Sequence, residues 1–267
     1  MTPGAIGQQI RKLEDWLGMT LFTRHVRLVQ PTPEALAYWQ RIQPALAQIA
    51  DASQKLRDSR NSAVWISMPP SFAAKWFPGR MARLLVKHPL LQLHLNATAA
   101  LVDFDQENID LAIRYFDGNA PHLDVTLLFG DEARIYCSPA YAEKIGIGES
   151  ADLARATLLV TTMQPLWPQW FRSFSAFDEQ AVAAMPRIHF DQGLVAIEAA
   201  KRGQGVILAS PLLTESEVAD GSLIEALPHR MTTPNAYYVV HPARQTLRPA
   251  AVAVKSWLIE EAAHSAA

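Results

Sequence analysis

The sequence predicts an α/β protein with a helical segment at its amino end. From residue 62 onward, short apolar runs alternate with helical patterns, which is typical of a largely parallel sheet. Over residues 33–60, apolar residues recur at steps of three and four, which predicts one long helix. The 267 residues are 49% hydrophobic and 19% charged, a balance that suits a globular chain of two modest domains rather than a disordered one.

Charge differs between the two parts of the chain. Lys and Arg total 24 and Asp and Glu total 26, which gives a net charge of −2. Residues 1–60 carry a net charge of +3, and residues 61–267 carry −5. This balance excludes a chain-wide polyanion binder, but a basic head suggests that this part meets an anionic partner. Chance variation in composition explains the asymmetry equally well.

Composition also bounds location and chemistry. The apolar runs are too short to span a bilayer and the first residues lack a secretory signal, so we expect a cytoplasmic protein without a membrane partner. A single cysteine, Cys137, excludes an internal disulfide framework. The sequence contains no zinc-protease motif, phosphate-binding loop, nucleophile elbow or metal-ligand spacing of histidines. We therefore expect neither an enzyme nor a bound cofactor or metal.

The first predicted element is an amphipathic helix. Thr2 is a candidate N-cap, Pro3 suits the first helical position, and Gly18 supplies the stop. The apolar stripe consists of Ile6, Ile10, Leu13 and Leu17. The opposite face carries two amides and two cations, namely Gln8, Gln9, Arg11 and Lys12.

A small basic hairpin is expected next. Arg24, His25 and Arg27 precede the strand-like pair Leu28 and Val29. An ordinary loop with exposed cations fits the same spacing.

The long helix of residues 33–60 carries a narrow apolar seam. The seam consists of Trp39, Ile42, Leu46, Ile49, Ser53 and Leu56. Such a heptad seam needs a partner, and the simplest partner is a second copy of the chain. The alternative is that the seam packs on the body of its own chain. Pro44 lies inside the pattern and predicts a kink or a local break.

The remaining residues predict two α/β blocks. Strands are expected at residues 64–68, 91–95, 111–113, 135–137, 158–160, 187–190, 206–209 and 237–240. Helices are expected at residues 73–88, with Ser71 as the cap, and at 105–108, 192–202 and 250–263. Two blocks of about a hundred residues each fit this length better than one.

Several strings resemble one family in the right order. TPGAIGQQIRKLEDWLGMTLFTR resembles the second half of the winged helix-turn-helix of LysR-type transcriptional regulators. Later strings resemble successive parts of that family's effector domain: PSFAAKWFPGRMARLLVKHP, DLAIRYFDG, CSPAY and AAKRGQGVILASPLL. LEDWLG and AIRYFDG look most like the branch of glycine-cleavage and β-lactamase-inducing regulators. The resemblance extends over essentially the whole chain.

The resemblance implies three parts. Residues 1–32 would be a truncated winged helix-turn-helix, and residues 33–61 a linker and dimerisation helix. Residues 62–267 would form a two-lobed effector domain like a periplasmic binding protein of type II. Its lobe one would comprise residues 62–136 and 241–263, and its lobe two residues 137–240.

Two departures from the family affect the expected DNA binding. The family has further helices before the recognition helix, whereas this sequence begins just before it, so we expect residues 1–30 to be poorly anchored and DNA binding to be impaired. Family members usually carry serine and arginine where this chain has Gly7 and Gln8.

The resemblance also implies site residues. The DNA-binding candidates lie on the first helix and the wing: Thr2, Gln8, Gln9, Arg11, Lys12, Arg24, His25 and Arg27. A small, polar, anionic effector would lie between the lobes near Ser71, Thr98, Arg114, Tyr115, Thr161, Thr162, Asp191 and Gln192. Alternatively, Ser71 and Asp191 only cap helices. Dimerisation would use Trp39, Ile42, Leu46, Ile49 and Leu56.

The partners implied are promoter DNA, a small-molecule effector and further copies of the chain in a homodimer or homotetramer. RNA polymerase is a further partner of such regulators. Two other readings stay open. One is an oligomeric small-molecule-binding protein without DNA binding, and the other is an enzyme on a related two-lobed fold, such as a cytosolic transferase.

Overall fold

The computed structural model describes residues 3–25, 28–58, 63–161 and 165–265. The chain divides into two compact units, Met1–Asn61 and Ser62–Ala267. No helix of the described residues is long and apolar enough to cross a membrane.

The amino-terminal unit contains two helices and a hairpin. Helix α1 (Pro3–Leu17) ends at Gly18, whose φ of 69° is the left-handed conformation that favours glycine at a helix end. Strands β1 (Phe22–His25) and β2 (Leu28–Pro31) pair in antiparallel fashion, which confirms the predicted hairpin.

Helix α2 (Pro33–Asp58) forms the rest of this unit. The Thr32 hydroxyl accepts a hydrogen bond from the amide of Ala35 at 3.1 Å and so caps the helix. The helix continues through Pro44, so the expected local break is wrong. One proline removes a single backbone hydrogen bond, and the turns on both sides keep the helical path.

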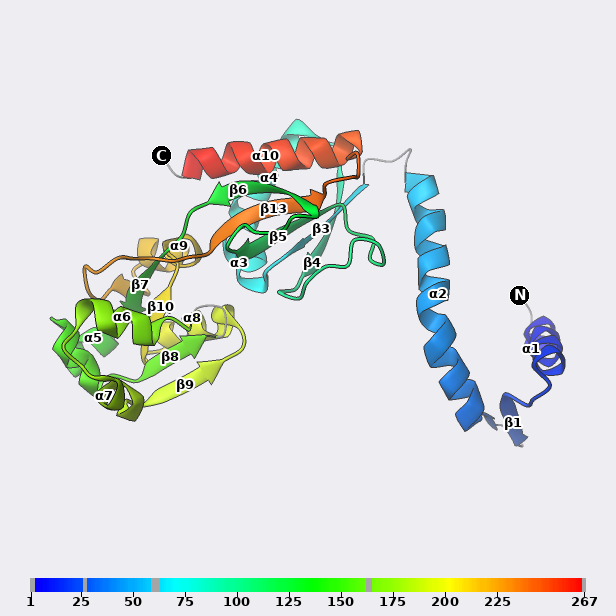
Figure 1. The fold of residues 1–267 in the computed structure, drawn as a ribbon, viewed down its shortest axis with the longest axis horizontal. Helices are drawn as coiled ribbons and strands as arrows, with labels where there is room; N and C mark the ends of the chain where they lie inside the picture. Colours follow the sequence, from blue (N-terminus) through cyan, green and yellow to red (C-terminus); the bar gives the residue numbers. More distant parts are fainter. Residues whose placement is uncertain (1–2, 26–27, 59–62, 162–164, 266–267) are drawn as a thin grey trace. The chain divides into compact units, whose positions relative to one another are not determined.

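The second unit contains two sheets (Figure 1). The sheet of lobe one has the order β4-β3-β5-β13-β6. Its strands are β3 (Ala63–Met68), β4 (Gln92–Ala97), β5 (Leu111–Phe116), β6 (Leu123–Phe129) and β13 (Ala236–Pro242). Its helices are α3 (Pro70–Lys75), α4 (Pro78–Lys87) and α10 (Pro249–Ser265).

The sheet of lobe two has the order β11-β7-β10-β8-β9, and β12 also pairs with β7. Its strands are β7 (Glu132–Cys137), β8 (Leu158–Thr161), β9 (Arg187–Phe190), β10 (Val206–Ala209), β11 (Ile224–Glu225) and β12 (Met231–Thr232). Its helices are α5 (Pro139–Ile145), the 3₁₀ helix η1 (Ser150–Arg155), α6 (Trp167–Phe174), α7 (Glu179–Ala184), α8 (Gly193–Lys201) and α9 (Pro211–Ala219).

Both sheets are mixed, although the sequence predicted largely parallel ones. Strand β3 is parallel to β4 and β5, and β8 is parallel to β9 and β10. In contrast, β13 is antiparallel to β5 and β6, and β7 is antiparallel to β10. The antiparallel strands β7 and β13 directly follow the two segments that connect the sheets, because the chain enters each lobe there from the other one.

The predicted lobe boundaries were wrong by one strand at each crossing. Residues 132–136 belong to β7 of the second sheet, and residues 236–240 belong to β13 of the first. The crossings are residues 130–131 and 233–235. After each crossing, the next strand forms its hydrogen bonds with the sheet of the lobe that it enters. The local apolar pattern does not encode this pairing.

Two predicted helices were also wrong. The helix expected over residues 73–88 is divided into α3 and α4, because Pro78 begins a new helix. Residues 105–108 form a turn instead of a helix. The Asp103 carboxylate accepts hydrogen bonds from the amides of Asp105 (3.0 Å) and Gln106 (3.2 Å), which favours the turn.

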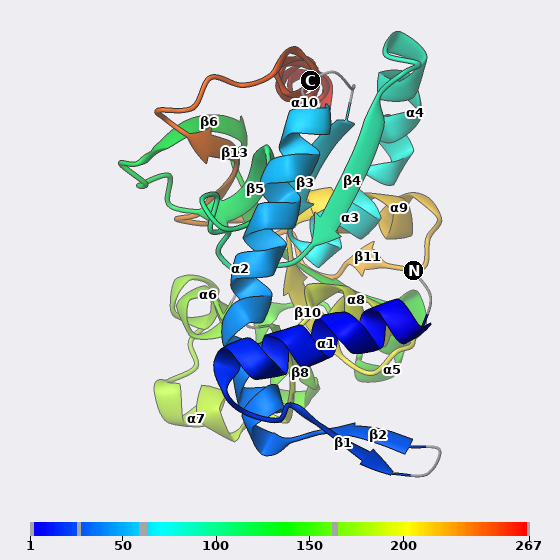
Figure 2. The same ribbon diagram turned by 90° about the vertical axis from the view of Figure 1, so that its right-hand side faces the viewer.

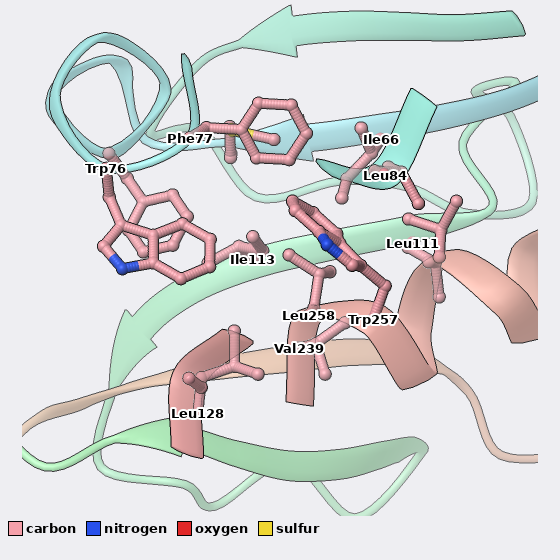
Figure 3. Close-up of a cluster of buried hydrophobic side chains, with 14 of the residues drawn as sticks. Ile66, Trp76, Phe77, Leu84, Leu111, Ile113, Leu128, Val239, Trp257 and Leu258 are labelled. Atoms are coloured by element: carbon pink, nitrogen blue, oxygen red, sulfur yellow. The ribbon is translucent and has the colours of Figure 1, made fainter. Parts of the chain in front are cut away.

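Aromatic side chains fill the core of lobe one (Figure 3). Trp76 and Phe77, which join α3 to α4, pack near Trp257 of α10. Ile66 and Ile113 from the central strands lie in the same buried cluster. Each fully buried side chain of this kind contributes about 1.5–3 kcal/mol. This packing fixes α3 against the sheet and so positions the residues at its start.

Candidate functional site

A small cavity lies where the two lobes meet. Ser71 of α3 comes from lobe one, whereas Thr161 of β8 and Gly193 of α8 come from lobe two. The cavity has a volume of about 20 Å³. Its walls are formed by Ser71, Tyr115, Thr161, Gly193, Ile197, Ile207, Leu208, Ala209, Leu213 and Tyr237.

Ser71 faces this cavity instead of capping a helix. Helix α3 starts after Pro69, and no side chain caps it, so the prediction of Ser71 as the cap is wrong. Ser71 lies inside the first turn and is buried. A Cβ atom added to Gly193 would lie only 3.2 Å from the Ser71 Oγ. The glycine therefore permits the close approach of the two lobes.

Two tyrosines extend the wall on the lobe-one side. The rings of Tyr115 and Tyr237 lie 4.8 Å apart between centroids. Burial raises the pKa of Tyr237 well above its usual value, so its phenol stays neutral. The site thus offers four hydroxyl side chains, and the described lining residues include no lysine or arginine.

A half-buried carboxyl group supports this wall. Asp131 lies at one of the crossings between the lobes, and burial raises its pKa to about 6. Ser210 donates a hydrogen bond to Asp131 Oδ1 at 2.5 Å, and Tyr115 also hydrogen-bonds to this carboxyl. The amide of Thr233, at the other crossing, donates to the backbone oxygen of Asp131 at 3.2 Å. Asp131 therefore links the two crossings through its backbone oxygen, and its carboxyl group joins them to the cleft wall.

The cleft is closed in this structure. A volume of about 20 Å³ accommodates about one water molecule. Ion pairs join the lobes beside it: Lys75 contacts Glu217, and Arg80 lies 3.1 Å from Glu215. A larger ligand would enter only if the lobes moved apart.

The structure brings together three of the predicted effector residues: Ser71, Tyr115 and Thr161. Thr98 does not line the cavity. Its hydroxyl accepts a hydrogen bond from the Ala100 amide at 3.1 Å in the turn after β4. Arg114 follows the sheet's alternation and lies on the face opposite to Tyr115.

The remaining predicted effector residues are not part of the cavity wall. Asp191 is exposed. Gln192 is the N-cap residue of α8, but its side chain makes no cap hydrogen bond. Thr162 lies outside the described residues.

The sequence did not reveal most of the remaining cavity wall. Gly193 carries no side-chain signal, and its role appears only when Ser71 faces it. Tyr237 had a usable signal, since the alternating strand 236–242 directs it to the same face as Val239. The sequence identified Ile207, Leu208 and Ala209 only as part of a buried strand.

The predicted DNA-facing side chains on α1 are exposed. This holds for Gln8, Gln9, Arg11 and Lys12. Glu14, which the sequence did not single out, joins the helix to the hairpin because its Oε1 accepts from the amides of Leu21 (2.8 Å) and Phe22 (3.0 Å). Thr2 and Arg27 lie outside the described residues, as do the side chains of Arg24 and His25.

The seam of α2 is largely solvent-exposed. Trp39, Leu46 and Ile49 are 51%, 48% and 64% exposed. Ile42 is half-buried, and the Ser53 hydroxyl donates to the carbonyl of Ile49 at 2.8 Å. The side chain of Leu56 lies outside the described part of the chain. In a single chain, most of these apolar side chains are therefore exposed to solvent.

These parts together define a class of protein. A helix with exposed amides and cations is followed by a hairpin and a long helix, and a separate unit has two α/β lobes around a cleft. This is the architecture of a ligand-responsive transcriptional regulator.

The family models identify the class more closely. Residues 57–263 match the LysR substrate binding domain, and residues 1–36 match the bacterial regulatory helix-turn-helix of the lysR family. The chain belongs to the LysR family of transcriptional regulators, which confirms the resemblance seen in the sequence. LysR regulators bind DNA and small-molecule effectors and form oligomers, and they are regulators rather than enzymes.

Individual relatives agree with this assignment. The chain is 29% identical over 266 residues to the glycine cleavage system transcriptional activator of Escherichia coli K12, covering 98% of this chain and 86% of the relative. The effector domain of AmpR of Pseudomonas aeruginosa superposes with a TM-score of 0.68 at 27% identity, over 76% of this chain and 97% of that one. CrgA of Neisseria meningitidis has the same fold, with a TM-score of 0.61 at 21% identity over 98% of this chain and 90% of that one.

Proposed function

We propose that this regulator senses a small, polar, anionic effector in the cleft between its lobes. The observation that carries the proposal is the meeting of Ser71 from lobe one with Gly193 and Thr161 from lobe two in one cavity. A molecule bound there would contact both lobes at once. Its binding would therefore favour one arrangement of the lobes over another.

The chemistry of the walls supports an anion. The first amides of helix α8 begin at Gly193, and helix N-termini attract negative charge because these N–H groups have no partner within the helix. The hydroxyls of Ser71 and Thr161 can donate to the same oxygen atoms. The apolar residues Ile197 and Leu213 restrict the remaining space. A compact carboxylate fits this combination.

A matched set of small probes tests the charge preference. Acetate, glycine and ethylamine are similar in size but differ in charge. We expect acetate and glycine to raise the melting temperature of the protein, and ethylamine to leave it unchanged, because stabilisation requires binding to the native state. Stabilisation by ethylamine alone would contradict an anion site.

A pair of glycine variants tests the location. Gly193→Val fills the cleft, whereas Gly79→Val places the same side chain near the start of α4, where a Cβ meets nothing within 4 Å. We expect the first variant to lose the response to acetate and the second to keep it. An unchanged response in Gly193→Val would place the probe elsewhere.

We also propose that the exposed face of α1 contacts promoter DNA. Glutamines bind adenine edges, and arginine and lysine bind guanine or phosphate. Fluorescence anisotropy on a duplex of roughly 30 base pairs would measure this binding. Replacing both Arg11 and Lys12 by alanine should reduce the salt slope of log K by about 2, one unit per lost phosphate contact. Arg41→Ala, an exposed cation of α2, is the control. A wild-type chain that binds acetate but no DNA would favour the alternative function, an oligomeric small-molecule-binding protein.

The assembly and location follow from the same proposal. A second copy of the chain would cover Trp39, Ile42, Leu46, Ile49 and Leu56, so that two DNA-facing helices meet one promoter as a dimer or as part of a tetramer. We propose that the regulator acts beside RNA polymerase at its promoter, and therefore in the cytoplasm.

A further inference from the structure

The guanidinium of Arg114 is buried without a carboxylate partner. The residue is only 9% exposed. Its Nη1 donates to the carbonyl of Ile113 at 2.6 Å, and its Nη2 donates to Ser67 Oγ at 2.7 Å and to the carbonyl of Ala100 at 2.9 Å. Its Nε–H has no acceptor among the described residues.

A second arginine of the same lobe, Arg248, has the carboxylate partner that Arg114 lacks among the described residues. Arg248 is 27% exposed at its side chain and pairs with Asp110, with Nη2 at 2.7 Å from Oδ2. Arg114 is more deeply buried, yet no Asp or Glu of the described chain lies within ion-pair distance of it. Burial lowers the pKa of Arg114, and only the distant charge of Glu107 opposes this effect. A buried cation without a counter-charge is costly unless something supplies the charge.

Arg114 lines a pocket that is separate from the cleft. The pocket has a volume of about 330 Å³ and lies on the face of β5 opposite to the aromatic core. Its walls are formed by Pro69, Ala99, Leu101, Arg114, Tyr115, Phe116, Asn119, Ala120, Leu123, Asn235 and Val240. Tyr115 is the one described residue that lines both this pocket and the cleft.

We propose that this pocket is a second ligand site, which binds a small organic monocarboxylate with an apolar body. The carboxylate would accept from the Nε–H of Arg114 and supply the missing negative charge. The amides of Asn119 and Asn235 offer further hydrogen bonds. Leu101, Leu123 and Val240 provide the apolar surface for the rest of the molecule. A volume of 330 Å³ lies within the range of small-molecule sites.

Hexanoate is a suitable probe, and hexanamide is its neutral counterpart. Isothermal titration calorimetry on the full chain should show binding of hexanoate, and at least tenfold weaker binding of hexanamide, because only the carboxylate pairs with the guanidinium. Equal affinities for the two compounds, or no heat of binding for hexanoate, would overturn the proposal.

Two substitutions at the rim test the charge without disturbing the core. Leu101 lines the pocket but is 92% exposed, so both Leu101→Asp and Leu101→Lys should fold normally. We expect the aspartate to weaken hexanoate binding and the lysine to strengthen it, each by about fivefold at low salt. The same affinity in both variants would contradict the proposal.

Two further variants separate this pocket from the cleft. Arg114→Met should abolish hexanoate binding, and its melting temperature shows whether the fold is retained. Gly193→Val blocks the cleft and should leave hexanoate binding intact. Loss of binding in Gly193→Val, together with no effect of the Leu101 variants, would assign hexanoate to the cleft and refute a second site.

Discussion

Lys75 of lobe one donates a hydrogen bond through its Nζ to the Oε1 of Glu217 in lobe two. Glu217 is 3% exposed, and the Lys75 side chain is also largely buried. Lys201 of α8 lies 3.7 Å from the same carboxylate oxygen. One buried carboxylate therefore binds a lysine from each lobe and holds the cleft closed.

Glu217→Gln should destabilise the protein strongly. The substitution removes the negative charge but leaves Lys75 buried, and breaking a buried pair in this way costs about 3 kcal/mol. Urea denaturation followed by circular dichroism measures the loss. Glu215→Gln is the matched control, because Glu215 pairs with Arg80 across the same lobes but is 62% exposed at its side chain. This control should change the free energy of unfolding by less than about 0.5 kcal/mol. Equal losses in the two variants would contradict the buried role of Glu217.

Asp131 should make stability fall with rising pH. Burial raises its pKa from 3.8 to about 6, so the native state holds a proton that the unfolded state has already lost. This contribution is greatest at low pH and is lost as the pH rises through 6. Between pH 5 and 8, the free energy of unfolding of the wild type should fall by about 1.4 kcal/mol more than that of Asp131→Asn.

Asp220→Asn is the control for this measurement. Hydrogen bonds from Ser222 lower the pKa of Asp220, so this carboxylate is ionised in both states above pH 5. Its replacement should leave the pH dependence of the free energy of unfolding between pH 5 and 8 unchanged. The same pH dependence in wild type and Asp131→Asn would refute the raised pKa of Asp131.

Cys137 should be unreactive in the native protein. Burial in β7 raises the pKa of its thiol to about 11, so about one molecule in a thousand carries the thiolate at pH 8. Ellman's reagent should therefore react far more slowly with the native protein than with the protein in guanidinium. Since this is the only cysteine, the released colour reports on lobe two alone. Fast stoichiometric reaction of the native protein would show that β7 is accessible.

The seam of α2 should control assembly. Leu46→Asp together with Ile49→Asp places two charges in the proposed contact. We therefore expect a tetramer to dissociate at least to dimers, or a dimer to monomers. Analytical ultracentrifugation at micromolar concentration measures the mass. Gln48→Asp adds charge to the same helix, away from the seam, and should leave the mass unchanged. A monomeric wild type would remove the basis for a dimer through this helix.

The sequence predicted elements with a strong local signal. Gly18 marked the end of α1, the apolar runs marked most strands, and the steps of three and four marked α2. It missed β6 and α6, although both carry a local signal. Leu123, Val125 and Leu127 alternate with polar residues, and the aromatic residues of Trp167–Phe174 recur at helical spacing.

The site was predicted only where a strand or helix end carried a hydroxyl. Ser71 and Thr161 were found in this way and line the cleft. Gly193 was missed because its contribution is the absence of a side chain opposite Ser71. Arg114 was assigned to the cleft because its position in the chain next to Tyr115 suggested it, whereas the alternation of a strand sends neighbours to opposite faces.

Lobe two begins and ends at almost the same point. Asp131, in the crossing that enters it, accepts a backbone hydrogen bond from Thr233, in the crossing that leaves it. Lobe one, by contrast, is built from the chain before and after this insertion, and its last element is α10 (Figure 2). A segment whose two ends meet can be exchanged as a cassette without moving the rest of the chain. Grafting this lobe from a related regulator is thus a route to a new chemical sensor that keeps the original promoter.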